Sequence, residues 1–311
     1  MILRLAAAAM GTRFELVLAP RDARDEVRLR AAGEAALERV EECDRRYSLF
    51  RSDSLVSLVN REACAREVRL DEEAYALFEV CLDAWRASDG AFDLTAGVRC
   101  QAPAAQTQQE PGTELDLASD RDDADGAWLR FGPPSRCLAP YRLDPERRTI
   151  RLLAPDASLD LGGVAKGFAL DQAAAILREN GLGLALFHGG TSSVVALGAP
   201  PGSKGWSVRL AATGERLELC DAALSVSAPH GRTLERDGRS LGHIVDPACG
   251  ASAPLGLSAA VSGPSATLCE VWSTALVVLA ARGAHAPGLP TGYAARVSRA
   301  SLSLPSPALA P

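Results

Sequence analysis

The 311-residue chain is poor in aromatic side chains, which make up 5% of it, so alanine, leucine and valine must fill its core. It also has no basic tract, and its formal net charge is −6. This balance argues against nucleic acid as the partner, because nucleic-acid-binding proteins gather Lys and Arg on one face. Long apolar runs are missing as well: the stretch 275–281 is too short to span a bilayer.

Cysteine pairs of the CxxC type are absent, although the chain has eight cysteines. They are scattered along the sequence, at Cys43, Cys64, Cys81, Cys100, Cys137, Cys220, Cys249 and Cys269. The scatter argues against a zinc site or a disulfide framework and favours buried thiols in a reducing compartment.

A convincing export signal is also lacking. Between Arg4 and Gly11 there are six apolar residues, fewer than the apolar core of a signal peptide needs. No cysteine lies nearby to serve as a lipoprotein anchor. The sequence therefore predicts a cytoplasmic protein, or a periplasmic one if a leader is missing.

Hydrophobic content of 47% and charged content of 23% are ordinary for a soluble globular protein. Alternating apolar residues predict strands, the first of them at 13–18, and apolar residues at helical spacing predict helices over 22–46 and 265–281. Hairpin signals such as Asp144 to Arg148 join many short strands. The fold class expected is α+β, with helices packed on a largely antiparallel sheet.

Two segments differ in composition from the rest. Residues 101–125 are rich in Gln, Pro, Asp, Ser and Thr and predict a mobile surface insertion. Residues 284–311 are rich in Pro and Ala and predict a loosely held tail.

A glycine-rich stretch, Asp160 to Asp171, stands between a predicted strand at 147–153 and a predicted helix at 172–180. Free backbone N–H groups and the positive end of a helix dipole can hold a phosphate at such a place. The stretch is neither a Walker A loop nor a dinucleotide GxGxxG, because its glycines are Gly162, Gly163 and Gly167. The alternative is an ordinary strand–helix connection that uses glycine for tight packing.

Two further pairs can carry chemistry. Glu270 and Thr274 are four apart on a predicted helix, so they share a face and can offer two oxygen ligands to Mg²⁺. The alternative is that both bond neighbouring turns of the helix. His243 precedes Asp246 by three residues, and it can serve a reacting group with Asp246 orienting it or shaping the turn. The alternative is that Asp246 simply starts a turn.

In their order along the chain, these pieces resemble the ApbE-type FAD:protein FMN transferase family. The resemblance runs from Met10 to about Leu279. The segments that carry it are Met10–Thr12, Arg51–Asn60, Phe92–Gly97, Asp160–Gly167, Gly189–Gly190, Ser227 with Arg232, His243–Gly250 and Ser265–Ala275.

The resemblance implies a single domain over residues 1–283, with an α+β fold related to the T-fold and an FAD cleft between lobes. It implies transfer of the FMN half of FAD to a Thr or Ser hydroxyl of an acceptor flavoprotein, with release of AMP. Mg²⁺ would be held by the carbonyl of Ala165 and the side chains of Glu270 and Thr274. His243 would be the general base for the acceptor hydroxyl, supported by Asp246.

By the same resemblance, Lys166 and the glycines beside it would assist the phosphates. The residues implied for the FAD site are Phe92, Asp93, Thr95, Gly162, Gly163, Ala165, Lys166, Gly189, Gly190, Ser227 and His243. The chain departs from the family at Glu270 and Thr191, where members usually carry Asp. Two alternatives stay open: an FAD pyrophosphatase that gives FMN and AMP, and an FAD-binding homologue without catalysis.

Overall fold

The computed structural model describes residues 2–19, 26–96, 139–155, 157–229, 233–236, 239–284 and 288–299. The predicted insertion at 101–125 and the residues Gly97 and Arg232 lie outside this part of the chain.

The fold centres on a seven-stranded sheet in which every neighbouring pair is antiparallel. In spatial order its strands are β1 (Leu3–Ala9), β2 (Thr12–Leu18), β6 (Ala185–Gly189), β7 (Ser193–Leu197), β10 (Ala222–Ser227), β13 (Leu257–Gly263) and β14 (Ala294–Arg299). Successive side chains of a strand point to opposite faces of the sheet, so every second residue can be buried. In β2 the buried residues are Phe14, Leu16 and Leu18, as the spacing of apolar residues predicted.

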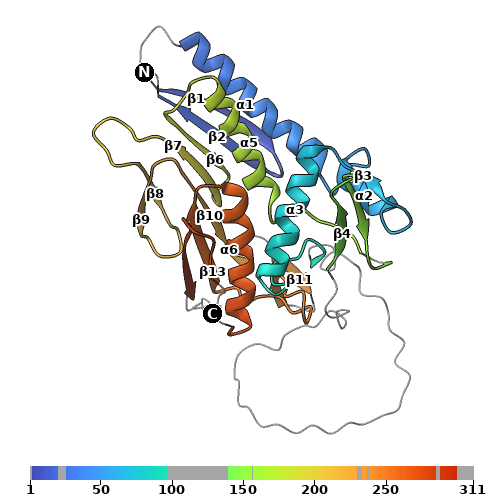
Figure 1. The fold of residues 1–311 in the computed structure, drawn as a ribbon. Coiled ribbons are helices and arrows are strands. Elements are labelled where there is room, and N and C mark those ends of the chain that lie inside the picture. The colour runs from blue at the N-terminus through green and yellow to red at the C-terminus, as the bar shows by residue number, and fades with distance from the viewer. Residues whose placement is uncertain are drawn as a thin grey trace, which may run out of the picture.

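Three helices cover one face of this sheet: α1 (Glu26–Tyr47), α5 (Ala165–Glu179) and α6 (Ala266–Ala281) (Figure 1). α5 lies between α1 and α6 and contacts both. α6 is apolar on nearly all sides because helices and strands surround it. A hairpin of β8 (Trp206–Arg209) and β9 (Arg216–Leu219) forms a separate small apolar cluster with β7 and β10.

A smaller part of the molecule holds a three-stranded sheet in the order β3 (Val68–Arg69), β5 (Thr149–Leu152), β4 (Tyr141–Asp144). Helices α2 (Leu55–Glu62) and α3 (Glu72–Ala87) lie beside it (Figure 1). Ser54 and Asp71 cap these helices by accepting the backbone N–H of Ser57 and Ala74. A further hairpin pairs β11 (Thr233–Arg236) with β12 (Arg239–Gly242).

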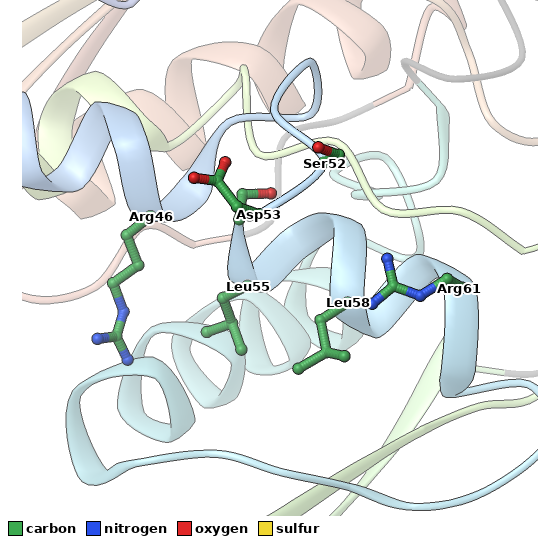
Figure 2. A pocket seen from close by; sticks show the side chains of 7 residues that line it. Arg46, Ser52, Asp53, Leu55, Leu58 and Arg61 are labelled. Atoms are coloured by element: carbon green, nitrogen blue, oxygen red, sulfur yellow. The ribbon is translucent and has the colours of Figure 1, made fainter.

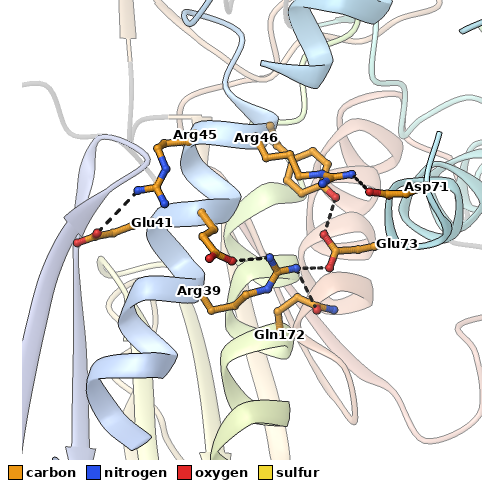
Figure 3. Close-up of polar contacts among 9 residues, drawn as sticks. Arg39, Glu41, Arg45, Arg46, Asp71, Glu73 and Gln172 are labelled. Atoms are coloured by element: carbon orange, nitrogen blue, oxygen red, sulfur yellow. Dashed lines mark hydrogen bonds and ion pairs between the residues drawn. The ribbon is translucent and has the colours of Figure 1, made fainter. Parts of the chain in front are cut away.

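Polar contacts tie α1 to α3 and α5 across the helical layer (Figure 3). Arg39 of α1 donates to Glu73 of α3 and, at 3.4 Å, to Gln172 of α5. Tyr47 donates its hydroxyl to Glu73 at 2.9 Å. Burial, and then the negative charge of Glu73, raise the pKa of Tyr47, so the phenol stays protonated and remains a donor.

The antiparallel α+β architecture confirms the predicted fold class. The loosely held tail was wrong in part, because residues 294–299 form β14 and pair with β13. The predicted helix start at 172 was also wrong. α5 begins at Ala165, so Lys166 and Gly167 of the glycine-rich stretch lie in the first turn of the helix. The apolar segment weighed as a leader forms β1.

The six described cysteines are all free thiols. Cys43, Cys81 and Cys269 are buried, and burial raises the pKa of the Cys43 thiol to about 12. These three are therefore protonated apolar side chains, as the sequence predicted. In the same part of the chain, no helix is long and apolar enough to cross a membrane.

The start of α6 is held by a carboxylate from another helix. Asp171 of α5 accepts the backbone N–H groups of Ala266 and Thr267, each at 2.9 Å, and the hydroxyls of Ser265 and Thr267 at 2.7 and 2.6 Å. A carboxylate at this end is also favoured by the helix dipole. Asp171 therefore fixes α6 against α5.

Replacing Asp171 with Ala is expected to lower the free energy of unfolding by about 2 kcal/mol, because helix N–H groups lose their acceptor. Urea unfolding measures this loss. Asp171→Asn is the control: one amide oxygen remains as acceptor, so it should cost less than the Ala variant. Equal costs for the two variants would contradict the cap.

Candidate active site

The turn before α5 is fixed from two sides. Asn60 of α2 donates to the carbonyl of Leu159 at 2.9 Å and accepts its N–H at 2.7 Å. The N–H of Asp160 donates to the carbonyl of Leu94 at 2.8 Å, and the carboxylate of Asp160 accepts the N–H of Gly162 at 2.8 Å. The turn is thus rigid without any ligand.

Glu270 of α6 lies at the first turn of α5. Its carboxylate is buried, with 3% of the residue exposed. One oxygen, Oε1, is 2.7 Å from Lys166 Nζ and accepts the Ser193 hydroxyl at 2.7 Å. The other, Oε2, accepts the N–H of Gly167 at 2.7 Å. A buried carboxylate is stable in this place because a cation and two hydrogen-bond donors surround it.

A chain of hydroxyls lies beside this carboxylate along α6, and it begins with Ser273, which donates to the backbone carbonyl of Glu270 at 3.0 Å. Ser273 is fully buried and lies 3.3 Å from the hydroxyl of Ser225 in β10. The Ser227 hydroxyl, at the end of β10, is 2.8 Å from Ser273 Oγ and 3.1 Å from Thr274 Oγ1. Polar groups of this kind are uncommon between a sheet and a buried helix, and here each has a partner.

The loop at 92–96 closes the site opposite α6. Asp93 accepts the N–H and the hydroxyl of Thr95, both at 2.7 Å, and so forms a tight turn. Phe92 lies beside Gly163: a Cβ on this glycine would be 3.6 Å from the Phe92 ring and 3.8 Å from Thr274 Oγ1. The predicted residues Phe92, Gly163 and Thr274 are therefore neighbours.

Gly189 and Gly190 form the hairpin turn that leads into Ser193. Gly190 has φ +61°, where an L side chain is strained, and a Cβ on it would meet the hydroxyl of Thr12. Gly189 pairs with Ser193, whose hydroxyl binds Glu270. The glycine turn is thus adjacent to the carboxylate site.

The segment that carries His243 lies next to Ser227. Gly242 packs against Pro229, two residues beyond Ser227, so closely that a Cβ at Gly242 would overlap the proline ring. His243 itself is exposed. The residues that follow turn back: Asp246 accepts the N–H of Ala248 at 2.7 Å.

The carboxylate of Asp246 is held by Arg282, the residue after α6. The guanidinium donates Nε to Oδ2 at 2.9 Å and Nη2 to Oδ1 at 2.7 Å, a two-pronged ion pair. Burial alone would raise the pKa of Asp246, but the hydrogen bonds from Arg282 and Ala248 outweigh it and the pKa lies below its usual 3.8. This arrangement favours a role for Asp246 in shaping the turn, and its support of His243 stays a prediction.

Replacing Arg282 with Met is expected to lower the free energy of unfolding at pH 7 by about 2 kcal/mol, because Asp246 stays buried without its cation. A carboxylate with a lowered pKa stabilises the fold above its unfolded pKa and loses this contribution as the pH falls through its folded value. The difference between wild type and variant should therefore shrink below pH 3.8. Urea unfolding at pH 7 and pH 3 measures it.

Arg86→Met is the matched control. Its partner is Asp83 at 2.8 Å, and both side chains are at least 60% exposed. An exposed ion pair of this kind is worth at most about 0.5 kcal/mol. A loss in Arg282→Met no larger than that in Arg86→Met would show that the pair does not hold the turn.

The structure thus brings Lys166, Glu270, Ser227 and Thr274 together, with Phe92, Gly163 and the Gly189 turn around them. Asp246 sits apart, at the other end of α6, since twelve helical residues from 270 to 282 span about 18 Å. Sequence reasoning missed Ser193, Ser225 and Arg282, and it gave no role to Asn60 and Ser273, which lie in segments that carry the resemblance. All of them act through contacts distant in sequence.

A hollow of about 410 Å³ lies outside this cluster, along α2 (Figure 2). It is lined by Arg46, Ser52, Asp53, Ser54, Leu55, Leu58 and Arg61. A neighbouring hollow of about 400 Å³ shares Arg46 and Asp53 with it. Neither touches Lys166 or Glu270, so the FAD cleft between lobes stays a prediction.

Comparison with known proteins points to one family. The chain is 29% identical over 258 residues to the FAD:protein FMN transferase of Treponema pallidum, covering 75% of this chain and 67% of that protein. It is 25% identical over 265 residues to the Klebsiella pneumoniae protein of the same name, covering 82% and 73%.

Solved structures share the fold. The crystal structure of the ApbE protein of Thermotoga maritima matches with a TM-score of 0.72 at 24% identity, covering 91% of this chain and 88% of that one. The apo flavinyl transferase ApbE of Pseudomonas stutzeri matches with a TM-score of 0.65 at 22% identity, covering 90% and 85%. The family model of the ApbE family matches residues 10–287, which include the whole cluster around Glu270. The chain belongs to the ApbE family.

Proposed function

We propose that this protein transfers the FMN half of FAD to a Thr or Ser hydroxyl of an acceptor protein and releases AMP. Membership of the ApbE family supports this reaction, and the two relatives described above are named FAD:protein FMN transferase. The observation on which the proposal rests most is the ion pair between Lys166 at the start of α5 and the buried Glu270. It puts a cation, a carboxylate and a helix N-terminus in one place.

This place suits a diphosphate. The positive end of the α5 helix dipole lies at the turn at 160–164, while the N–H groups of Ala165 and Gly167 already donate to Leu161 and Glu270. Lys166 adds a full positive charge there, and its side chain is 22% exposed, within reach of a ligand. Together they would balance charge on the phosphorus under attack.

In the proposed step, the acceptor oxygen bonds to the phosphorus of the FMN half. The bond from this phosphorus to the bridging oxygen breaks, and AMP leaves with that oxygen. The proton of the acceptor hydroxyl goes to His243, which is exposed and follows the segment packed on Pro229. His243 is thus the general base of this proposal.

Mg²⁺ is part of the proposal. The donors available to it are all oxygen: the Glu270 carboxylate, the Thr274 hydroxyl and the carbonyl of Ala165, which adjoins two residues that contact Glu270. This set suits Mg²⁺, and among the described residues no group of three His, Cys, Asp or Glu forms another metal site. When bound, the ion would polarise the diphosphate and stabilise developing charge.

A two-product assay tests the function. The purified protein is incubated with FAD, Mg²⁺ and a Thr-containing acceptor fragment. Transfer predicts equal amounts of AMP and of a covalent flavin adduct detected by mass spectrometry. AMP with free FMN would support the pyrophosphatase instead, and FAD binding without AMP would reject both enzymes.

The acceptor is a flavoprotein in this proposal, and a single domain acts on it, made of residues 1–283 together with strand β14 at 294–299. A cytoplasmic acceptor follows from the sequence prediction. Pull-down of flavin-labelled proteins from each cell fraction would test the compartment.

A further inference from the structure

Lysine is nearly absent from this protein. Of its 33 basic residues only two are lysines, Lys166 and Lys204. In the described part of the chain, arginine makes every carboxylate ion pair except those of Lys166 and His188. The buried carboxylate of Glu270 is thus paired with the rarer of the two cations, whereas that of Asp246 is paired with arginine.

The two cations behave differently against a carboxylate. Arginine binds with a planar two-pronged fork, as Arg282 does on Asp246. Lysine offers a compact ammonium on a flexible stem and makes a single-point contact that is easily exchanged. The other two donors to Glu270 are fixed, because Gly167 N–H is backbone and Ser193 is fully buried.

Lys166 occupies the side of the carboxylate that a metal ion would need. Its Nζ is 2.7 Å from Oε1, and Mg²⁺ binds carboxylate oxygen at about 2.0–2.1 Å. Oε1 already has two partners, Lys166 and Ser193, so a Mg²⁺ ion on this oxygen would have to replace one of them and would repel the ammonium. Lys166 is partly exposed and can leave, whereas Glu270 is buried on a fixed helix.

We propose that Lys166 is an exchangeable counter-ion of Glu270, which Mg²⁺ displaces from the carboxylate when it binds. The proposal rests on the Mg²⁺ site of the proposed function. The ammonium keeps the buried carboxylate neutralised in the absence of metal. Once displaced, it turns toward the exposed side of the site, where the diphosphate of the substrate would meet it.

Mg²⁺ titration without nucleotide tests the competition between Lys166 and Mg²⁺ for Glu270, with one variant that weakens the competitor and one that strengthens it. Lys166→Met removes the competing charge and should bind Mg²⁺ at least ~10-fold more tightly than wild type by calorimetry. Lys166→Arg keeps the charge and adds a second prong, so it should bind at least ~10-fold more weakly. Ser193→Ala, which removes a neutral donor from the same oxygen, is the control and should not bind Mg²⁺ more tightly.

A measurement on wild type does not depend on any variant folding. Limited acetylation with acetic anhydride, followed by mass spectrometry, reports the two lysines separately because there are only two. Mg²⁺ should speed acetylation of Lys166 about threefold or more, as the amine leaves its carboxylate. Lys204 is exposed in a loop and serves as the internal reference, with an unchanged rate.

The outcomes separate this proposal from the function it rests on. Mg²⁺ binding that is equal in wild type, Lys166→Met and Lys166→Arg, with unchanged Lys166 acetylation, overturns the exchange and leaves the Mg²⁺ site standing. No Mg²⁺ binding in any of the proteins overturns both the exchange and the metal site. FMN transfer in the two-product assay is judged independently of either result.

Discussion

Glu270→Gln is expected to lower the rate of FMN transfer by about 100-fold, the usual scale for losing a group that manages charge in the transition state. The amide keeps the size of the side chain but removes its negative charge. Lys166 would then have no buried anion to pair with, and the proposed Mg²⁺ site would lose its only carboxylate. Formation of the covalent flavin adduct, followed over time at saturating FAD, measures the effect.

Glu179→Gln is the matched control for this variant. Glu179 lies exposed at the end of α5 and loses the same charge by the same substitution. Its transfer rate should stay within about twofold of wild type, since isolated surface substitutions have small effects. A rate in Glu270→Gln similar to that of Glu179→Gln would remove Glu270 from the proposed machinery.

Gly167→Ala is expected to destabilise the fold by about 3 kcal/mol or more, because overpacking against backbone cannot be relieved by a rotamer change. A Cβ at this position would overlap the carbonyl oxygen of Ala266 and lie 2.9 Å from the N of Thr267. α5 and α6 would have to move apart, and the hydrogen bond from Gly167 N to Glu270 would lengthen. Urea unfolding and the melting temperature measure the loss.

Gly163→Ala provides the comparison within the same glycine-rich stretch. Its Cβ would make ordinary contacts, 3.6 Å to Phe92 and 3.8 Å to Thr274. The expected change in stability is within about 1 kcal/mol. If both alanine variants unfolded alike, close approach of the helices would not be the reason for glycine at 167.

The difference between these two glycines also shows what the sequence could predict. The closely spaced glycines of the stretch at 160–171 predict a turn. The structure has this turn up to Val164, where α5 follows. Gly167, however, lies inside α5, and the close approach of α6 at Ala266, 99 positions further along the chain, requires a glycine there. Nothing local distinguishes a glycine of a turn from a glycine of a helix crossing, so the predicted helix start was late.

In the candidate site too, local spacing was predictable from the sequence, but contacts between distant segments were not. The spacing of Glu270 and Thr274 predicted one shared helix face, and both side chains do join the same polar cluster of α6. The contact between Gly167 and Glu270 spans 103 positions and depends on how α5 packs against α6, which no local pattern records. Strand β14 was missed for a related reason: its residues are mostly exposed, so its pairing with β13 left little alternation in the sequence.

Helix α6 links the two halves of the candidate site, with Glu270 in its second turn, Thr274 at its middle and Arg282 just past its end. Each residue of a helix advances it by 1.5 Å and turns it by about 100°. One residue inserted between Thr274 and Arg282 would therefore swing the guanidinium away from Asp246 while the carboxylate of Glu270 stayed in place. The number of residues in this segment fixes the direction in which Arg282 points relative to Glu270. This segment can therefore accept substitutions, but an insertion or a deletion would break the contact with Asp246.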